Sequence, residues 1–383
     1  MPTNRRRRPP ALFALAALSA ACGAPAASPT SPSSPAASPA SATTPSGASI
    51  ALPTPARTLV ALSKGDHTLA IVSPADLHVL AREPVGPDPH EVVASADGKT
   101  AYVSNTGSGR FHEIDVVDLI AQKSLAPIDT GALLGPHGLA FAGGKVWFTA
   151  EGAKAVAHYD PAAARIDWVL GTGQNRTHMI YVAPDEKHVY ATNVDSGSVS
   201  LLENVLRPPP PPPPGGAPPP GMAPPEGHPP PPRADWDQTV VQLTRGVEGF
   251  DVTADGRELW TASAQDGNVS VIDLGTKKVT ATIDARAFGA NRLKLTPDGK
   301  LALVSTMQSG ELVVLDAPSR KPLKRVPVGR GAAGLLVDAD GARAFVSCTG
   351  ADYVAVVDLK TLQVTAHVDV GKNPDGLAWA VRP

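Results

Sequence analysis

The chain has few cysteines and few aromatic side chains. Its 383 residues include two cysteines, Cys22 and Cys348, and aromatic residues make up 4% of the total. No Cys-x-x-Cys-His sequence is present, which excludes a covalently attached c-type haem. The scarcity of aromatic rings argues against a stacking platform for single-stranded nucleic acid or for carbohydrate.

An excess of positive charge is also absent. The chain has 34 basic and 36 acidic residues, and four of the basic ones are the consecutive arginines at positions 5–8. Nucleic-acid binding normally requires a basic face, and no cluster of Lys or Arg occurs in the rest of the chain. Nucleic acid is therefore not an expected partner.

The N-terminus has a short apolar run, Ala11–Ala21, that is not long enough to span a membrane. With the basic residues before it, this run predicts a signal peptide over residues 1–21. Leu18–Gly23 resembles a bacterial lipobox, in which Cys22 would be lipidated after cleavage and the folded domain would contain no disulfide. An ordinary cleaved signal followed by a disordered leader is the alternative.

Residues 22–57 are almost entirely Ala, Pro, Ser and Thr, with no apolar periodicity. Such a segment cannot bury enough apolar surface to offset its ordering entropy, so we expect a flexible tether. The predicted location is exported, periplasmic or on the outer surface, with the lipid on Cys22 anchoring a monomer to the bacterial cell envelope.

One short pattern recurs seven times along the remaining chain. Its clearest copies begin at Pro89, Val247 and Ala332, and each contains apolar strands separated by Asp-Gly and other Gly-containing turns. Equivalent positions are 41 to 47 residues apart, except for one gap of 70 that contains a Pro-rich tract at residues 207–233. Strand-turn-strand units with a period just above forty residues are typical of propeller blades.

The last copy stops after a single strand, and its missing partners lie in the segment that begins at Thr58. We therefore predict an all-β, seven-bladed β-propeller of four-stranded antiparallel blades over residues 58–383. The N- and C-terminal strands would share one blade and leave no open edge. An eight-bladed ring or a two-domain chain would need another copy, which the sequence does not contain.

The second strands of two copies read Tyr102-Val103-Ser104-Asn105 and Tyr190-Ala191-Thr192-Asn193. On these motifs the chain resembles the YVTN-repeat (YncE-like) β-propeller family from about Thr58 to its C-terminus. The resemblance implies a seven-bladed propeller that is usually exported and often has no assigned reaction. A more distant similarity to propeller lactonases and to the haem d1 propeller of nitrite reductases also allows a cofactor-bearing propeller.

The Pro-rich tract, residues 207–233, contains 16 of the 41 prolines and lies between the third and fourth strands of its blade. We expect it to be a disordered insertion in the propeller. Polyproline II segments can dock on aromatic grooves, so the tract is either a ligand for an envelope partner or a tolerated low-complexity loop.

One position repeated in every blade suggests a site. Just ahead of each first strand, where the blades crowd around one mouth of the central channel, six of seven residues are polar. They are His90, His137, His178, Glu248, Asn291, Ala333 and Asp375. Three imidazoles could hold a divalent ion such as Zn, Cu or Fe, while Glu248 or Asp375 could act as the general base and Asn291 could bind the ligand.

Two kinds of function remain open. The first is an envelope-anchored module that binds a small molecule or an envelope protein through this histidine-rich mouth. The second is a metal-dependent hydrolase or lactonase, or a lyase, that uses the same histidines. Without a metal, protonated histidines could bind an anionic molecule. A solvated mouth whose polar residues only satisfy strand ends is the structural alternative.

Overall fold

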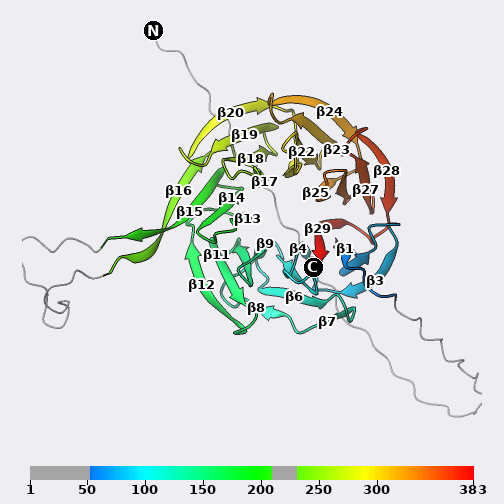
Figure 1. Ribbon diagram of the computed structural model, residues 1–383, viewed down its shortest axis with the longest axis horizontal. Helices are drawn as coiled ribbons and strands as arrows, with labels where there is room; N and C mark the ends of the chain where they lie inside the picture. The colour runs from blue at the N-terminus through cyan, green and yellow to red at the C-terminus, as the bar shows by residue number, and fades with distance from the viewer. Residues whose placement is uncertain (1–51, 209–230) are drawn as a thin grey trace, which may run out of the picture. The chain divides into compact units, whose positions relative to one another are not determined.

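The computed structural model describes residues 52–208 and 231–383. They form seven antiparallel sheets around a central channel (Figure 1). This confirms the predicted seven-bladed propeller, and the described residues contain no eighth blade. The predicted signal peptide, Cys22, the tether as far as residue 51 and residues 209–230 of the insertion lie outside the described part of the chain.

Every blade has its strands in the same radial order. The innermost strands are β4 (Pro89–Ala94), β9 (Pro136–Ala142), β13 (Thr177–Val182), β17 (Val247–Val252), β21 (Ala290–Leu295), β25 (Ala332–Val337) and β29 (Pro374–Val381). The second strands are β5 (Thr100–Asn105), β10 (Lys145–Ala150), β14 (His188–Asn193), β18 (Glu258–Ser263), β22 (Leu301–Thr306), β26 (Arg343–Cys348) and β1 (Arg57–Ser63).

The third strands are β6 (Glu113–Asp118), β11 (Ala155–Asp160), β15 (Ser198–Arg207), β19 (Asn268–Asp273), β23 (Glu311–Asp316), β27 (Tyr353–Asp358) and β2 (Thr68–Val72). The outer strands are β7 (Lys123–Ser124), β8 (Ile128–Asp129), β12 (Arg165–Gly171), β16 (Arg233–Gln242), β20 (Lys278–Asp284), β24 (Lys321–Pro327), β28 (Gln363–Val368) and β3 (Val79–Pro84). We number the blade that contains β29 and β1 as blade 1, and the others as blades 2 to 7 in chain order.

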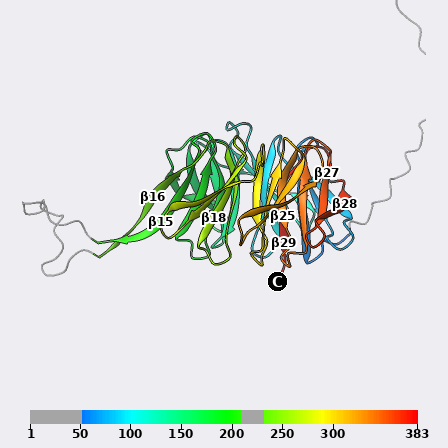
Figure 2. The ribbon, with the colours of Figure 1, turned by 90° about the horizontal axis from the view of Figure 1, so that it is seen from above.

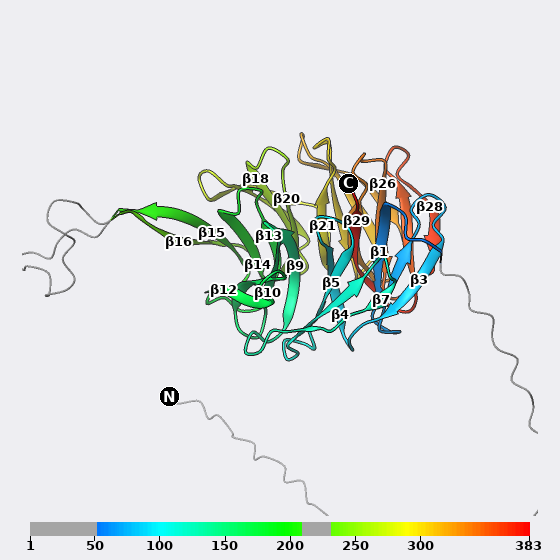
Figure 3. The same cartoon turned by 60° about the horizontal axis from the view of Figure 1, so that its bottom comes forward.

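The ring is closed by the two ends of the chain. Strand β29 pairs with β1 in antiparallel register, with Leu59 opposite Trp379 and Arg57 opposite Val381 (Figure 3). The C-terminal strand is thus the innermost strand of blade 1, as predicted, and its backbone groups are paired rather than left at an open edge. Packing begins before β1, because Thr54 is buried and its hydroxyl donates to the carbonyl oxygen of Leu119 at 2.5 Å.

Side chains fill the wedges between neighbouring blades. Each of the seven hydrophobic clusters joins two adjacent blades, which matches the number of blade interfaces. At the closing interface Leu59 of blade 1 packs with Phe345 and Val356 of blade 7. The alternating apolar residues of the repeat therefore form a ring of inter-blade cores, as expected for stacked repeats that cannot bury their faces alone.

A β-bulge occurs in the innermost strand of every blade. In blade 3, for example, His137 and Gly138 together face Thr149 of β10, where the strand register shifts. The corresponding shifts recur in the other six blades. The mouth residues are therefore the second residues of their strands, and not the residues ahead of them as the sequence predicted. A bulge bends the strand and redirects its side chains, here toward the channel.

In five of the seven blades, a hydroxyl side chain opposite the bulge bonds to the next blade. Ser104 of blade 2 accepts a hydrogen bond from the backbone N–H of Glu91 in its own blade and donates one to the carbonyl oxygen of His137 in blade 3. The same bond to the next blade is made by Thr149, Thr192, Ser305 and Ser347. These hydroxyls occupy the third position of the YVTN-like motif, so the motif satisfies backbone groups that the bulge leaves without ladder partners.

The Pro-rich insertion begins and ends on an extended two-stranded stem. Strands β15 and β16 pair as far as Arg207 and Arg233, and the stem projects beyond the rim of the ring (Figure 2). Within the described residues, no helix has the length and apolar character required to cross a membrane.

Candidate functional site

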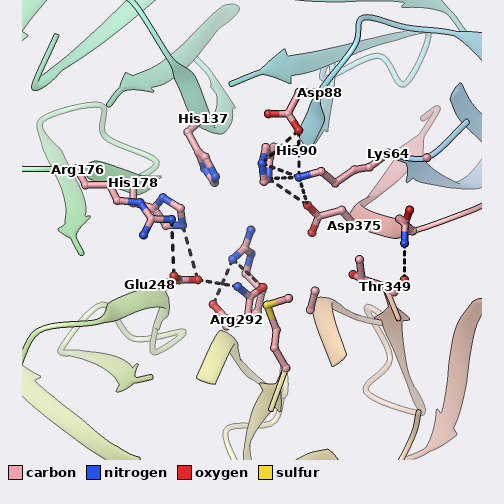
Figure 4. A pocket seen from close by; sticks show the side chains of 15 residues that line it. Lys64, Asp88, His90, His137, Arg176, His178, Glu248, Arg292, Thr349 and Asp375 are labelled. Atoms are coloured by element: carbon pink, nitrogen blue, oxygen red, sulfur yellow. Dashed lines mark hydrogen bonds and ion pairs between the residues drawn. The ribbon is translucent and has the colours of Figure 1, made fainter. Parts of the chain in front are cut away.

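All seven repeat-equivalent residues line one cavity at the mouth of the channel. The cavity has a volume of about 380 Å³. Besides these residues, its lining includes Lys64, Asp88, Arg176 and Arg292, whose side chains converge on the channel axis (Figure 4). The repeat position therefore predicted that these seven residues meet at the channel mouth, and the four additional charged residues come from outside that position.

The three histidines form a stack across blades 2, 3 and 4. The ring centroid of His137 lies 4.8 Å from that of His90 and 3.8 Å from that of His178. His137 is only 2% exposed, and its Nδ1 atom has no hydrogen-bond partner among the described residues. Burial, together with the neighbouring imidazoles, holds the pKa of His137 well below its usual range. His137 is thus neutral at pH 7 and offers a free lone pair.

His178 is held by a carboxylate that the sequence did not single out. Its Nδ1 atom lies 2.5 Å from Oε1 of Glu151, which follows β10 in blade 3. Burial acts to raise the pKa of Glu151, but His178 and Arg176 outweigh it and lower that pKa. One ligand atom from each of His137, Glu151 and His178 lies within 4.8 Å of the others, which makes this a group able to hold a metal ion.

His90 has different neighbours. Its Nδ1 atom lies 3.0 Å from Asp375, and its Nε2 atom lies 2.6 Å from the ammonium nitrogen of Lys64. Lys64 is also 3.2 Å from Asp88. Burial acts to raise the pKa of Asp375, but His90, Arg292 and Lys64 lower it on balance, so this residue is an ionised anchor for His90. The structure places His90 in the stack but outside the three-residue group that could hold a metal.

Glu248 and Asn291 form a second polar pair on the opposite side of the cavity. The side-chain amide of Asn291 donates to Oε2 of Glu248 at 2.6 Å, and the same oxygen lies 3.9 Å from Nε2 of His178. Arg176 approaches Glu248 to 3.8 Å. Glu248 therefore faces the histidines as a hydrogen-bonded carboxylate, whereas the predicted alternative base, Asp375, is used in an ion-pair cluster with His90 and Lys64.

An ion pair crosses the channel below the histidines. Arg292 of blade 6 bonds to Glu91 of blade 2, and both side chains are almost fully buried. Burial acts to lower the pKa of Arg292, but Glu91, Asp375 and Glu248 outweigh it and raise that pKa. Both residues also line a separate, largely apolar cavity of about 340 Å³. The pair thus divides the channel into a polar mouth and an apolar lower section.

The period of the repeat does not predict this crossing, although the sequence contains a signal for it. Arg292 and Glu91 occupy the position that follows the mouth residue in each blade, and four blades have glycine there: Gly138, Gly249, Gly334 and Gly376. Opposite charges in place of glycine at a channel-facing position indicate a specific pair. Cys348, by contrast, is fully buried, and burial raises the pKa of its thiol to about 12, which fits the packing role expected for it.

No family model matches the chain, and no curated protein matches it. Many solved structures share the fold. Dihydro-haem d1 dehydrogenase NirN in complex with DHE is similar over 82% of this chain, with 19% identity and a TM-score of 0.56, and this chain spans 64% of that protein. Hydrazine synthase from Kuenenia stuttgartiensis matches over 79% of this chain and 92% of its own, with 16% identity and a TM-score of 0.61.

A third structure is a Bacteroides fragilis protein provisionally assigned as a 6-phosphogluconolactonase. It matches over 85% of this chain and 98% of its own, with 14% identity and a TM-score of 0.63. At such low sequence identities these neighbours establish the fold of this chain. The chemistry of its site has to be inferred from the residues of the site itself. By fold, the chain is a seven-bladed β-propeller with lactonase-like and haem-enzyme structural neighbours.

Proposed function

We propose that the channel mouth binds a divalent transition-metal ion and, through it, a small-molecule ligand, and that the protein acts as a binding module of the cell envelope. The observation that carries this proposal is the buried, unpartnered Nδ1 atom of His137 beside His178 and Glu151. A buried polar atom without a partner is costly unless a ligand completes it.

The donors suit such an ion. Two imidazoles and one carboxylate are a set that binds zinc with an open position. Glu151 could serve in one of two ways: as the third ligand or, through its 2.5 Å contact with Nδ1 of His178, as the carboxylate that orients a histidine ligand. The charges that line the mouth cavity balance, with Asp88, Glu248 and Asp375 against Lys64, Arg176 and Arg292. A cation is favoured by the donor group itself, which includes the carboxylate of Glu151.

The first test is the metal content of the purified, dialysed protein, measured by inductively coupled plasma mass spectrometry. We expect about one Zn, Cu or Fe ion per chain, and we expect the His137→Ala protein to lose most of it because a buried ligand has been removed. A matched control is His188→Ala, because His188 is more exposed and contacts Asp185 at the other end of blade 4.

Thermal melting of both variants shows whether the fold is intact. If wild-type protein reloaded with Zn²⁺, Cu²⁺ or Fe²⁺ kept none after dialysis, the metal proposal would be wrong. A folded His137→Ala protein that kept its full metal content would be equally contrary to it.

A hydrolase or lactonase is the second candidate. Glu248 favours it, because this hydrogen-bonded carboxylate faces the cavity 3.9 Å from His178 and could take a proton from water there. The structural neighbour provisionally assigned as a lactonase adds only analogy of fold. If the protein hydrolysed a lactone in a metal-dependent reaction, and His137→Ala abolished that activity, the protein would be this enzyme and not a binding module.

The envelope anchor and the YVTN-repeat relationship are part of the proposal and rest on the sequence. We expect the full-length protein, expressed in a bacterium, to be in the membrane fraction and to incorporate labelled fatty acid. Cys22→Ala should abolish the labelling and release the protein, because stable membrane attachment would then have no lipid. Unchanged labelling in Cys22→Ala would contradict the lipobox assignment.

A further inference from the structure

The residue two positions before each mouth residue has a left-handed backbone in six of the seven blades. In four blades this residue is glycine, as the sequence of the repeat shows: Gly135, Gly246, Gly289 and Gly331, with φ between 68° and 86°. Blade 1 has Asn373 with φ 51°. Glycine accepts this region without steric cost, and asparagine is among the side chains that tolerate it best.

Blade 4 departs from this pattern with Arg176, whose φ is 56°. Left-handed backbone disfavours arginine relative to glycine, although thirteen other non-glycine residues in the described ranges, Arg286 and Arg320 among them, also adopt it. The contacts of the Arg176 side chain therefore distinguish this position more than its backbone does. The Nε atom of Arg176 lies 3.3 Å from Glu151, and Nη2 lies 3.8 Å from Glu248. The guanidinium therefore joins the carboxylate of the proposed metal group to the carboxylate opposite it, at the position where four other blades have glycine.

Arg176 also faces a second cavity beside the first. This cavity has a volume of about 570 Å³, and His90, His137 and Arg176 line both cavities. The second cavity reaches Glu151 and continues over the turns that follow β5 and β14, where Ser108 and Asp195 line it. A molecule bound at the metal group can thus extend sideways over the mouth face.

A second arginine lines the far side of this cavity. Arg245 is exposed, and its Nε atom donates to the carbonyl oxygen of Asp195 at 2.9 Å beside the cavity. Arg245 makes no ion pair with any residue in the described ranges. Two guanidinium groups with remaining N–H donors are suited to a carboxylate or a phosphate, which they can bind in bidentate fashion.

We propose that Arg176 and Arg245 form an anion subsite beside the His137–Glu151–His178 group, so that the ligand of the mouth is a small molecule with a carboxylate or phosphate group. This inference rests on the proposed function, because it names the ligand class of the same site. Glu151 and Asp195, which line the same cavity, limit the subsite to anions that contact the arginines directly.

The test is isothermal titration of the full-length, metal-loaded protein with malonate and, separately, with inorganic phosphate. Arg176→Gly restores the residue that four other blades have, so the backbone should fold normally. We expect Arg176→Gly and Arg245→Ala each to weaken binding of the preferred anion roughly tenfold or more, as the loss of a charge-assisted hydrogen bond implies. Whether malonate or phosphate binds more tightly distinguishes a carboxylate ligand from a phosphate ligand.

Arg330→Ala is the matched control. Arg330 holds the place in blade 7 that Arg245 holds in blade 5, three residues before the mouth residue, but it lines neither cavity. Its replacement should leave anion affinity unchanged. If all three variants weakened anion binding equally, the effect would come from the overall surface charge, and the subsite proposal would be wrong.

The measured metal content separates this inference from the proposed function. Stoichiometric metal with no binding of either anion would overturn the subsite and leave the metal site standing. Anion binding that needs Arg176 and Arg245 in protein unable to take up metal would support the subsite and overturn the metal proposal.

Discussion

Replacing Arg292 with alanine should lower the free energy of unfolding by about 3–5 kcal/mol, because the change leaves the carboxylate of Glu91 buried without its partner. The side chain of Glu91 is only 12% exposed, so water cannot readily take the place of the guanidinium. Chemical denaturation, followed by tryptophan fluorescence, measures the loss.

The control removes both charges at once. Glu91→Leu combined with Arg292→Met should recover much of the stability, because two apolar side chains of similar size avoid the cost of burying ions. If Arg292→Ala alone changed stability by less than about 1 kcal/mol, the crossing would behave like an exposed surface pair, and its burial would have no energetic consequence.

Gly138→Ala should also be strongly destabilising, by about 3 kcal/mol, at the upper end of the usual cost of overpacking. A Cβ atom at Gly138 would lie closer than 3.0 Å to the carbonyl oxygen of His178 and to the Cα atom of Met179. Both obstacles are backbone atoms, so blades 3 and 4 would have to move apart. The stack of His137 on His178 should loosen as well, and the metal content should fall with the melting temperature.

Gly171→Ala in the same blade is the matched control. Gly171 lies at the end of the outer strand β12, and a Cβ atom there would meet nothing within 4 Å. We expect the Gly171 variant to melt within a degree or two of the wild type. If both variants lost similar stability, the cause would be the replacement of any strand glycine, and not a clash between neighbouring blades.

The fold was predictable from the sequence because every blade repeats the same short pattern of strands and turns. Asp-Gly turns such as Asp97-Gly98, alternating apolar residues and a fixed period gave the number of blades and the closure of the ring. A hydroxyl residue equivalent to Ser104 recurs in several blades, but its bond to the next blade could not be predicted. That bond depends on a β-bulge, which adds a residue to the inner strand without changing the apolar pattern of the sequence.

The site was predictable only where it follows the repeat. His90, His137 and His178 share one repeat position, so the period brought them to one mouth. Glu151 belongs to a turn after a second strand and reaches His178 only because two blades meet there. Lys64 is similar, since it follows β1 at the other end of the chain and contacts His90 only in the closed ring. Contacts between different repeat positions carry no periodic signal.

Ring closure also sets an order of events during synthesis. Asp375 lies in the last strand and Lys64 follows the strand that pairs with it, yet both contact His90. Until β29 has been synthesised and has left the ribosome, blade 1 lacks its inner strand and His90 lacks the carboxylate of Asp375. The channel mouth can therefore reach its final form only after β29 has paired with β1.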